Sequence, residues 1–195
     1  MPLQQIITTW FALNGSNDET ASGVADLRTG APLFVGGLNI GDYFDVTEQE
    51  ANEHSWDDIG ILHSGRYRRV QVHANATAAN VTRGKIGFMV TSLIPEVNIV
   101  TSADAAAGGL FGVRPVVFLN QVTPGKYCFI QELGVASMLM VTAGGAIGAN
   151  VGVPSGSTDG TITSAGTPVI GQLLDAGAAN TQVRVLMNGV PIIQG

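Results

Sequence analysis

Short apolar runs separated by glycine and polar turn residues make up most of this chain, and this pattern predicts β-strands joined by tight turns. Val183, Val185 and Met187 alternate with residues that favour the opposite face, as in a strand with one buried face. Residues 126–133 carry apolar side chains on both faces, which indicates a central strand covered on both sides. The pattern predicts ten strands, at residues 67–73, 86–91, 97–100, 113–119, 126–133, 138–142, 147–153, 161–163, 168–174 and 181–188.

Helix signals are sparse. Residues 47–58 predict a helix in which Thr47 caps the first turn and Glu50, three residues later, completes a capping box. Further helical turns are expected only at residues 104–107 and 173–179. The fold class predicted is therefore all-β, a small antiparallel β-barrel or sandwich with glycine-rich turns, preceded by an extension that contains one short helix.

One short sequence occurs twice. Residues 81–88 and 122–129 share the pattern V-T-x-G-K and a closing Phe, at an offset of 41 residues. A turn glycine followed by a strand, used repeatedly, is how a barrel is built from similar hairpins. The sequence leaves open whether the two copies reflect a duplication or a common turn that recurs by chance.

The number and distribution of charged residues indicate a domain boundary and the kind of partner. Charged residues are 12% of the chain, against about 25% in typical domains, while apolar residues are 45%, so some faces are expected to be buried against partners. Residues 1–58 hold ten acidic side chains and one basic one, whereas the rest holds eight basic and five acidic. This asymmetry predicts an acidic N-terminal extension at residues 1–62 and a β-barrel domain at residues 63–195. The net charge of −6 disfavours nucleic acid as a partner.

The remaining composition points to a protein made in a cytoplasm. A single cysteine, Cys128, forms no internal disulfide and is expected to pack inside an apolar strand. No stretch has the pattern of a secretory signal, and no apolar run reaches the roughly 20 residues of a membrane span. We expect no membrane partner.

No motif predicts catalysis or a cofactor. The Gly-Lys pairs at 84–85 and 125–126 lack the following Ser or Thr of a phosphate-binding loop, and no Ser lies in a G-x-S-x-G elbow. One cluster is suggestive: side chains on one helical face, continued by a histidine, could hold a divalent metal or exchange protons, namely Glu50, His54, Asp57, Asp58 and His63. A solvated helix face beside a capping box has the same pattern, and we predict the latter. The expectation is therefore no enzyme, no metal and no small-molecule substrate.

Two groups of residues are candidates for protein interfaces. Arg66, Arg68 and Arg69 form the basic cluster of the chain and are expected to pair with the acidic segment, within one chain or between subunits. The N-terminal apolar side chains could anchor an arm on a neighbouring subunit, or belong to the first strand of their own sheet; they are Ile6, Ile7, Trp10 and Phe11.

The order of several strings in residues 65–189 resembles the head-decoration (capsid cement) proteins of tailed phages. The most specific are P-G-K-Y-C-F-I-Q-E-L-G-V-A at residues 124–136 and the closing P-V-I-G-Q-L-L and V-R-V-L at residues 168–174 and 183–186. Weaker matches are V-Q-V-H-A-N-A-T at residues 70–77, V-T-R-G before F-M-V, and G-G-L-F-G-V at residues 108–113. Residues 1–62 have no counterpart.

The resemblance implies a structural virion protein that sits on the outer capsid surface, assembles in the host cytoplasm, binds the major capsid protein and often forms homotrimers. Two other functions remain open at this stage. A virion attachment protein, such as a fibre or knob that binds a host surface, would share this composition, and a small hydrolase is the enzymatic alternative.

Overall fold

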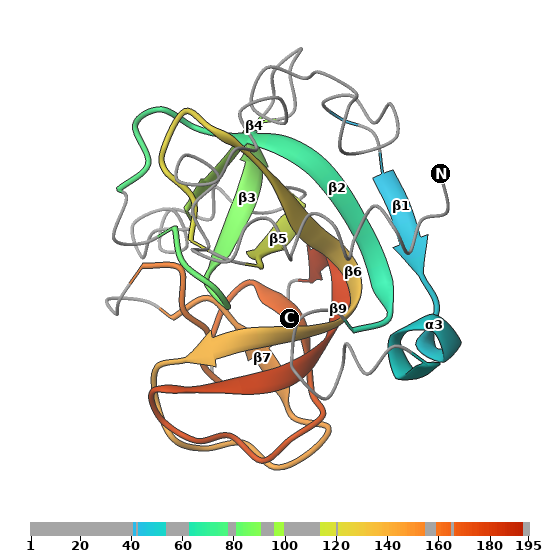
Figure 1. Ribbon diagram of the computed structural model, residues 1–195. Helices are drawn as coiled ribbons and strands as arrows, with labels where there is room; N and C mark the ends of the chain where they lie inside the picture. The colour runs from blue at the N-terminus through green and yellow to red at the C-terminus, as the bar shows by residue number, and fades with distance from the viewer. Residues whose placement is uncertain are drawn as a thin grey trace.

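The computed structural model describes residues 41, 43–53, 63–77, 81–90, 96–99, 114–119, 121–154, 159–164 and 166–192 (Figure 1). These residues form nine strands and one short helix: β1 (Tyr43–Val46), α3 (Glu48–Glu53), β2 (Gly65–Val72), β3 (Ile86–Val90), β4 (Glu96–Ile99), β5 (Pro115–Phe118), β6 (Tyr127–Met140), β7 (Asn150–Gly152), β8 (Val169–Leu173) and β9 (Thr181–Ile192). The all-β class predicted from the sequence is confirmed.

The nine strands belong to one sheet, in the order β1-β2-β4-β3-β5-β6-β9-β8-β7. Neighbouring strands are antiparallel except β2 and β4, which run parallel. The sheet curls so that β2 also pairs with β6, and β2, β4, β3, β5 and β6 are each paired with the next. The sheet as a whole has two ends, β1 and β7, so it is not closed into a barrel, which was one of the two arrangements expected from the sequence.

Strand β6 connects the two parts of the sheet. Its first half pairs with β2 and β5, and its second half pairs with β9 from Gly134 to Met140. The sequence predicted two strands here, at residues 126–133 and 138–142, because Gly134 and its small neighbours weaken the strand pattern. The structure instead has one strand of 14 residues that passes from the first part to the second.

Two glycines allow the backbones of β2 and β6 to meet where β6 changes partners. Gly134 pairs with Gly65 and has a positive φ of 93°. A Cβ at Gly134 would lie 2.6 Å from the Cα of Gly65 and would overlap the carbonyl oxygen of Ser64. A Cβ at Gly65 would lie 2.6 Å from the side-chain nitrogen of Gln131. No larger residue fits either position without moving the backbone of the other strand.

The repeated sequence corresponds to a repeated structure. Residues 82–85 and 123–126 both form turns, in which the N–H of Lys85 or Lys126 donates to the Thr carbonyl three residues earlier at 3.1 Å. The third residue of each turn is a glycine, with φ of 76° and 82°, as a type II turn requires. Each turn also bonds to the last residue of a strand: the first to Phe118 of β5, the second to Val72 of β2. The matching bonds favour duplication over chance.

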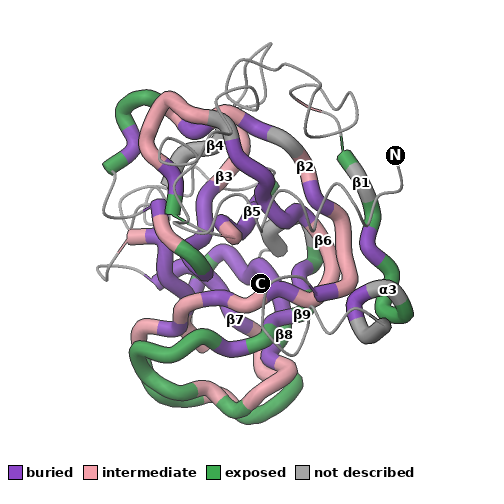
Figure 2. The backbone as a smooth tube through the Cα atoms, viewed as in Figure 1, coloured by how far each residue is buried: buried purple, intermediate pink, exposed green. Residues whose placement is uncertain are grey.

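The buried apolar side chains form two clusters, one on each side of the change of partners. The first lies between β2, β5 and the start of β6 and comprises Val70, Val72, Ala76, Val81, Val116, Phe118, Val122, Cys128 and Ile130. The second lies between β6, β8 and β9 and comprises Ile86, Val117, Ala136, Met138, Met140, Val151, Val153, Ile162, Ile170, Leu173, Val183, Val185 and Met187. Figure 2 shows buried backbone running through both regions. Phe129 is also buried, which confirms that residues 126–133 are covered on both faces.

The helix prediction is confirmed at its start. Helix α3 begins directly after Thr47, whose carbonyl accepts the N–H of Ala51 at 3.0 Å. The helical turn predicted at residues 173–179 is wrong, because Leu173 ends β8 and the residues after it form bends and a turn that leads into β9. Residues 104–107 lie outside the described residues, and so do residues 54–62, which leaves the boundary at residue 62 a prediction.

Replacing Gly134 with Ala is expected to destabilise the fold far more than replacing Gly125 with Ala. Both glycines have positive φ, so both substitutions carry the backbone penalty of roughly 1 kcal/mol. Gly125 has no heavy atom within 4 Å of an added Cβ, whereas Gly134 faces the β2 backbone. Urea unfolding of both variants tests the close contact between Gly134 and the β2 backbone. Equal unfolding midpoints would contradict the importance of this contact for stability.

Val185→Asp is expected to abolish folding, because Val185 is fully buried and an unpaired carboxylate there costs several kcal/mol. The matched control is Leu186→Asp on the same strand, where the side chain is 43% exposed. Circular dichroism melts should show no cooperative transition for the first variant and a nearly wild-type transition for the second. A wild-type-like melt for Val185→Asp would refute the assignment of this core.

Candidate functional site

The structure describes only part of the predicted interface. Arg66, Arg68 and Arg69 all lie on β2, and the side chain of Arg69 is outside the description. The N-terminal apolar residues also lie outside it: Ile6, Ile7, Trp10 and Phe11. The interface role of these seven residues stays a prediction.

Arg66 pairs with the acidic segment of its own chain. Because β1 is antiparallel to β2, Asp45 lies opposite Arg66, and its two carboxylate oxygens accept the Arg66 Nε and Nη2 hydrogens at 2.8 and 3.0 Å. The guanidinium also stacks on the Tyr43 ring, 4.4 Å from its centroid. The hydrogen bond from Arg66 lowers the pKa of Asp45, and burial opposes this only in part. This group ties β1 to β2 and remains accessible to solvent.

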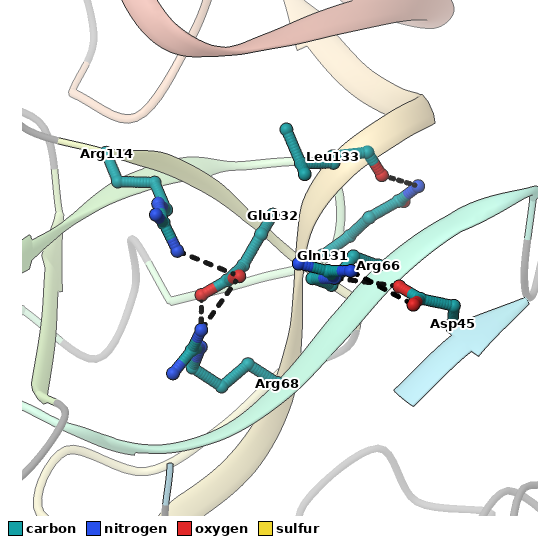
Figure 3. Close-up of polar contacts among 7 residues, drawn as sticks. All are labelled: Asp45, Arg66, Arg68, Arg114, Gln131, Glu132 and Leu133. Atoms are coloured by element: carbon teal, nitrogen blue, oxygen red, sulfur yellow. Dashed lines mark hydrogen bonds and ion pairs between the residues drawn. The ribbon is translucent and has the colours of Figure 1, made fainter. Parts of the chain in front are cut away.

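Arg68 turns to a different partner, the buried carboxylate of Glu132 on β6 (Figure 3). Glu132 is completely buried, and its second oxygen accepts a hydrogen bond from Arg114 at 3.2 Å. Arg68 also donates to the carbonyl oxygen of Gly41 at 2.9 Å. The positive charges of Arg68 and Arg114 offset the cost of burying the negative charge of Glu132. The arrangement joins β2, β6 and the residue before β5, and it has the character of a structural ion pair.

Of the suggestive cluster around α3, only the side chain of His63 lies within the described residues. His54, Asp57 and Asp58 lie outside them, and within them no three His, Cys, Asp or Glu side chains come together as a metal site would require. His63, expected near a solvated face, is buried instead. Its backbone is held by the hydroxyl of Tyr67, which accepts from the N–H and donates to the carbonyl. Its Nε2 lies 2.8 Å from the Oγ of Ser137.

His63 lines two cavities. One, of about 220 Å³, lies between α3 and the ends of β8 and β9 and is lined by Glu48, Ala51, His63, Ser64, Val135, Leu174 and Arg184. The other, of about 10 Å³, contains Ser137 and has room for about one water molecule. The histidine and serine therefore meet beside the smaller space, whereas the larger one is not lined by Ser137.

Two further charged groups are held within the chain. Arg184 binds both oxygens of Asp175, at 2.8 Å for the shortest contact, and this hydrogen bonding lowers the pKa of Asp175. Lys85, in the first repeated turn, is buried and donates to the carbonyl oxygen of Asp159 at 2.7 Å; burial lowers its pKa. Asp45 and Asp175 contribute stability above their unfolded-state pKa and lose it as pH falls through the folded-state pKa.

Sequence reasoning missed one surface, the loops at residues 141–149 and 176–180, which we call the uncharged end. Neither loop contains a charged residue. Both are largely exposed and lie together beyond β7 and β8 (Figure 2). Ile147, in the first loop, is 70% exposed, the largest fraction among the exposed large apolar side chains of the described residues. The absence of charge is visible in the sequence, but the meeting of the two loops is not.

Comparison with solved structures finds likeness at low sequence identity. The head fiber gp8.5 N base of bacteriophage phi29 aligns over 66% of this chain and 98% of its own, with a TM-score of 0.43 and 12% sequence identity. These values are too low to establish a shared fold or function. No protein-family profile matches the sequence, and no curated protein matches it. Within the described residues, no helix is long and apolar enough to cross a bilayer.

Glu132→Gln is expected to lower the free energy of unfolding by roughly 1–3 kcal/mol, because it removes the anion from the half-buried Arg68 and from the more exposed Arg114. Asp45→Asn is the control. It breaks an ion pair whose carboxylate is half exposed, and such pairs contribute little. Chemical unfolding at neutral pH compares the two, and similar losses would show that the buried pair is not a main tie between the strands.

Proposed function

We propose that this chain is a structural virion protein of a tailed phage that binds the outer capsid surface and stabilises junctions between major capsid subunits. The observation that carries the proposal is the position of the strings that resemble head-decoration proteins. The string at residues 124–136 supplies the second repeated turn and most of the central strand β6. The strings at residues 168–174 and 183–186 supply β8 and a part of β9 in which Val183 and Val185 are buried.

The described contacts fit a protein that acts by binding rather than by chemistry. The ion pairs at Arg66 and Arg68 join β1 to β2 and β2 to β6, so these charges support the fold. Glycine-mediated backbone contacts leave the sheet little freedom to change shape. A rigid domain loses little conformational entropy on binding, so more of the contact energy remains as affinity. Repetition of a modest footprint over a shell multiplies its effect.

Assembly as a homotrimer, with the major capsid protein as partner and the virion surface as location, belongs to the same proposal. The support is the resemblance together with the low charge of the chain, 12% of residues. The absence of nucleic-acid, membrane and small-molecule partners is proposed on the same basis.

The test is a search for the chain on phage particles. Particles purified from the host that produces the chain are analysed by mass spectrometry and imaged by cryo-electron microscopy. We expect the chain in many copies over the shell, and we expect particles stripped of it by mild denaturant to rebind recombinant protein. Density confined to a fibre or tail tip would support the attachment protein instead, and absence from particles would overturn a virion role.

A further inference from the structure

The uncharged end differs from the rest of the molecule in its charge. In the described residues between Glu132 and Arg184 the only charged side chains are Asp159 and Asp175, and Asp175 is bound by Arg184. Exposed protein surface normally carries charged residues at roughly one position in four. A continuous exposed surface without charge fits a site of protein contact, and Ile147 supplies it with one large apolar side chain.

The two loops are held together by their backbones. The N–H of Gly144 donates to Gly177 at 3.3 Å, and that of Gly177 donates to Gly145 at 3.0 Å. Gly148 and Leu173 are joined in the same way, through the bond from the Gly148 N–H to the Leu173 carbonyl at 2.8 Å. Asn180, at the end of the second loop, donates to the carbonyl of Met140 at 2.8 Å. These bonds fix the direction in which the exposed side chains point.

Glycine is needed for this close contact. A Cβ at Gly177 would overlap the carbonyl oxygen of Gly144 and lie 2.9 Å from the Cε of Met140. Gly145 has a φ of 94°, and a Cβ there would lie 2.6 Å from the Cδ1 of Leu173. The backbone that carries Ile147 is therefore already ordered, so binding costs little loop entropy.

We infer that the uncharged end is the surface that seats on the capsid shell, with Ile147 as its apolar anchor in a neutral, apolar hollow between shell subunits. This inference rests on the proposed function. Phosphates and anionic lipids need cations, which these loops lack, so the complementary partner is uncharged protein. The acidic N-terminal half enters the sheet through β1, at the opposite end of the strand order from β7.

The experiment measures rebinding of recombinant full-length protein to particles stripped of it. Ile147→Asp is expected to weaken binding at least tenfold, and Ala178→Asp, on the other loop, to weaken it similarly. Both sites are exposed, so the melting temperatures should stay near wild type. Ile147→Val and Leu186→Asp, which alters an exposed apolar residue outside the uncharged end, should bind like wild type.

Two further readouts separate the alternatives. Binding through an uncharged surface should change little between about 50 and about 500 mM salt, whereas docking through the acidic segment would weaken steeply. Analytical ultracentrifugation of Ile147→Asp should show the wild-type oligomer; dissociation would mean that a second copy, not the shell, covers this end, and would overturn the inference. Equal binding by Ile147→Asp and wild type would also overturn it. If wild type itself does not rebind, the proposed function fails instead.

Discussion

The contact between Gly65 and Gly134 is the constraint on which the sheet depends. At this point the backbones of β2 and β6 approach so closely that neither position has room for a side chain. Because the two backbones approach closely, β6 can pair with β2 before the contact and with β9 from the contact onward. One strand thus contributes to both hydrophobic clusters, and the arrangement needs no connecting loop between the two parts of the sheet.

The polar interior follows from the same arrangement. Glu132 lies two residues before the glycine contact, where β6 is covered by the curled sheet and its carboxylate has no access to water. Arg68 reaches it from β2, and Arg114 reaches it from the start of β5. β2 and β6 are separated widely in sequence and pair because the sheet curls, whereas β5 and β6 are neighbours in the strand order. The ion pair therefore both requires the curl and holds it in place.

Local patterns predicted the strands, and contacts between distant residues account for the errors. The alternation around Val185 was sufficient to identify the buried face of β9, because a half-buried strand imposes it directly. The division of β6 into two strands was wrong because Gly134 has the same local signal whether it ends a strand or lets two strands touch. The turn at residues 173–179 has helix-forming alanines, but its backbone is bonded to the other loop of the uncharged end. The buried position of His63 involves contacts with Tyr67 and Ser137, and the sequence pattern did not predict these contacts.

The repeated turns have a consequence for how the chain acquires its structure. The turn of the first repeat is bonded to Phe118, at the end of β5, and the turn of the second repeat is bonded to Val72, at the end of β2. Each turn therefore bonds to a strand that precedes the other repeat in the sequence. During synthesis, the first turn and the end of β2 lack these partners until β5 and the second turn have left the ribosome. Interlocking of this sort makes folding slow, because distant segments must meet first, and makes the finished domain cooperative, because neither half can open without exposing the other.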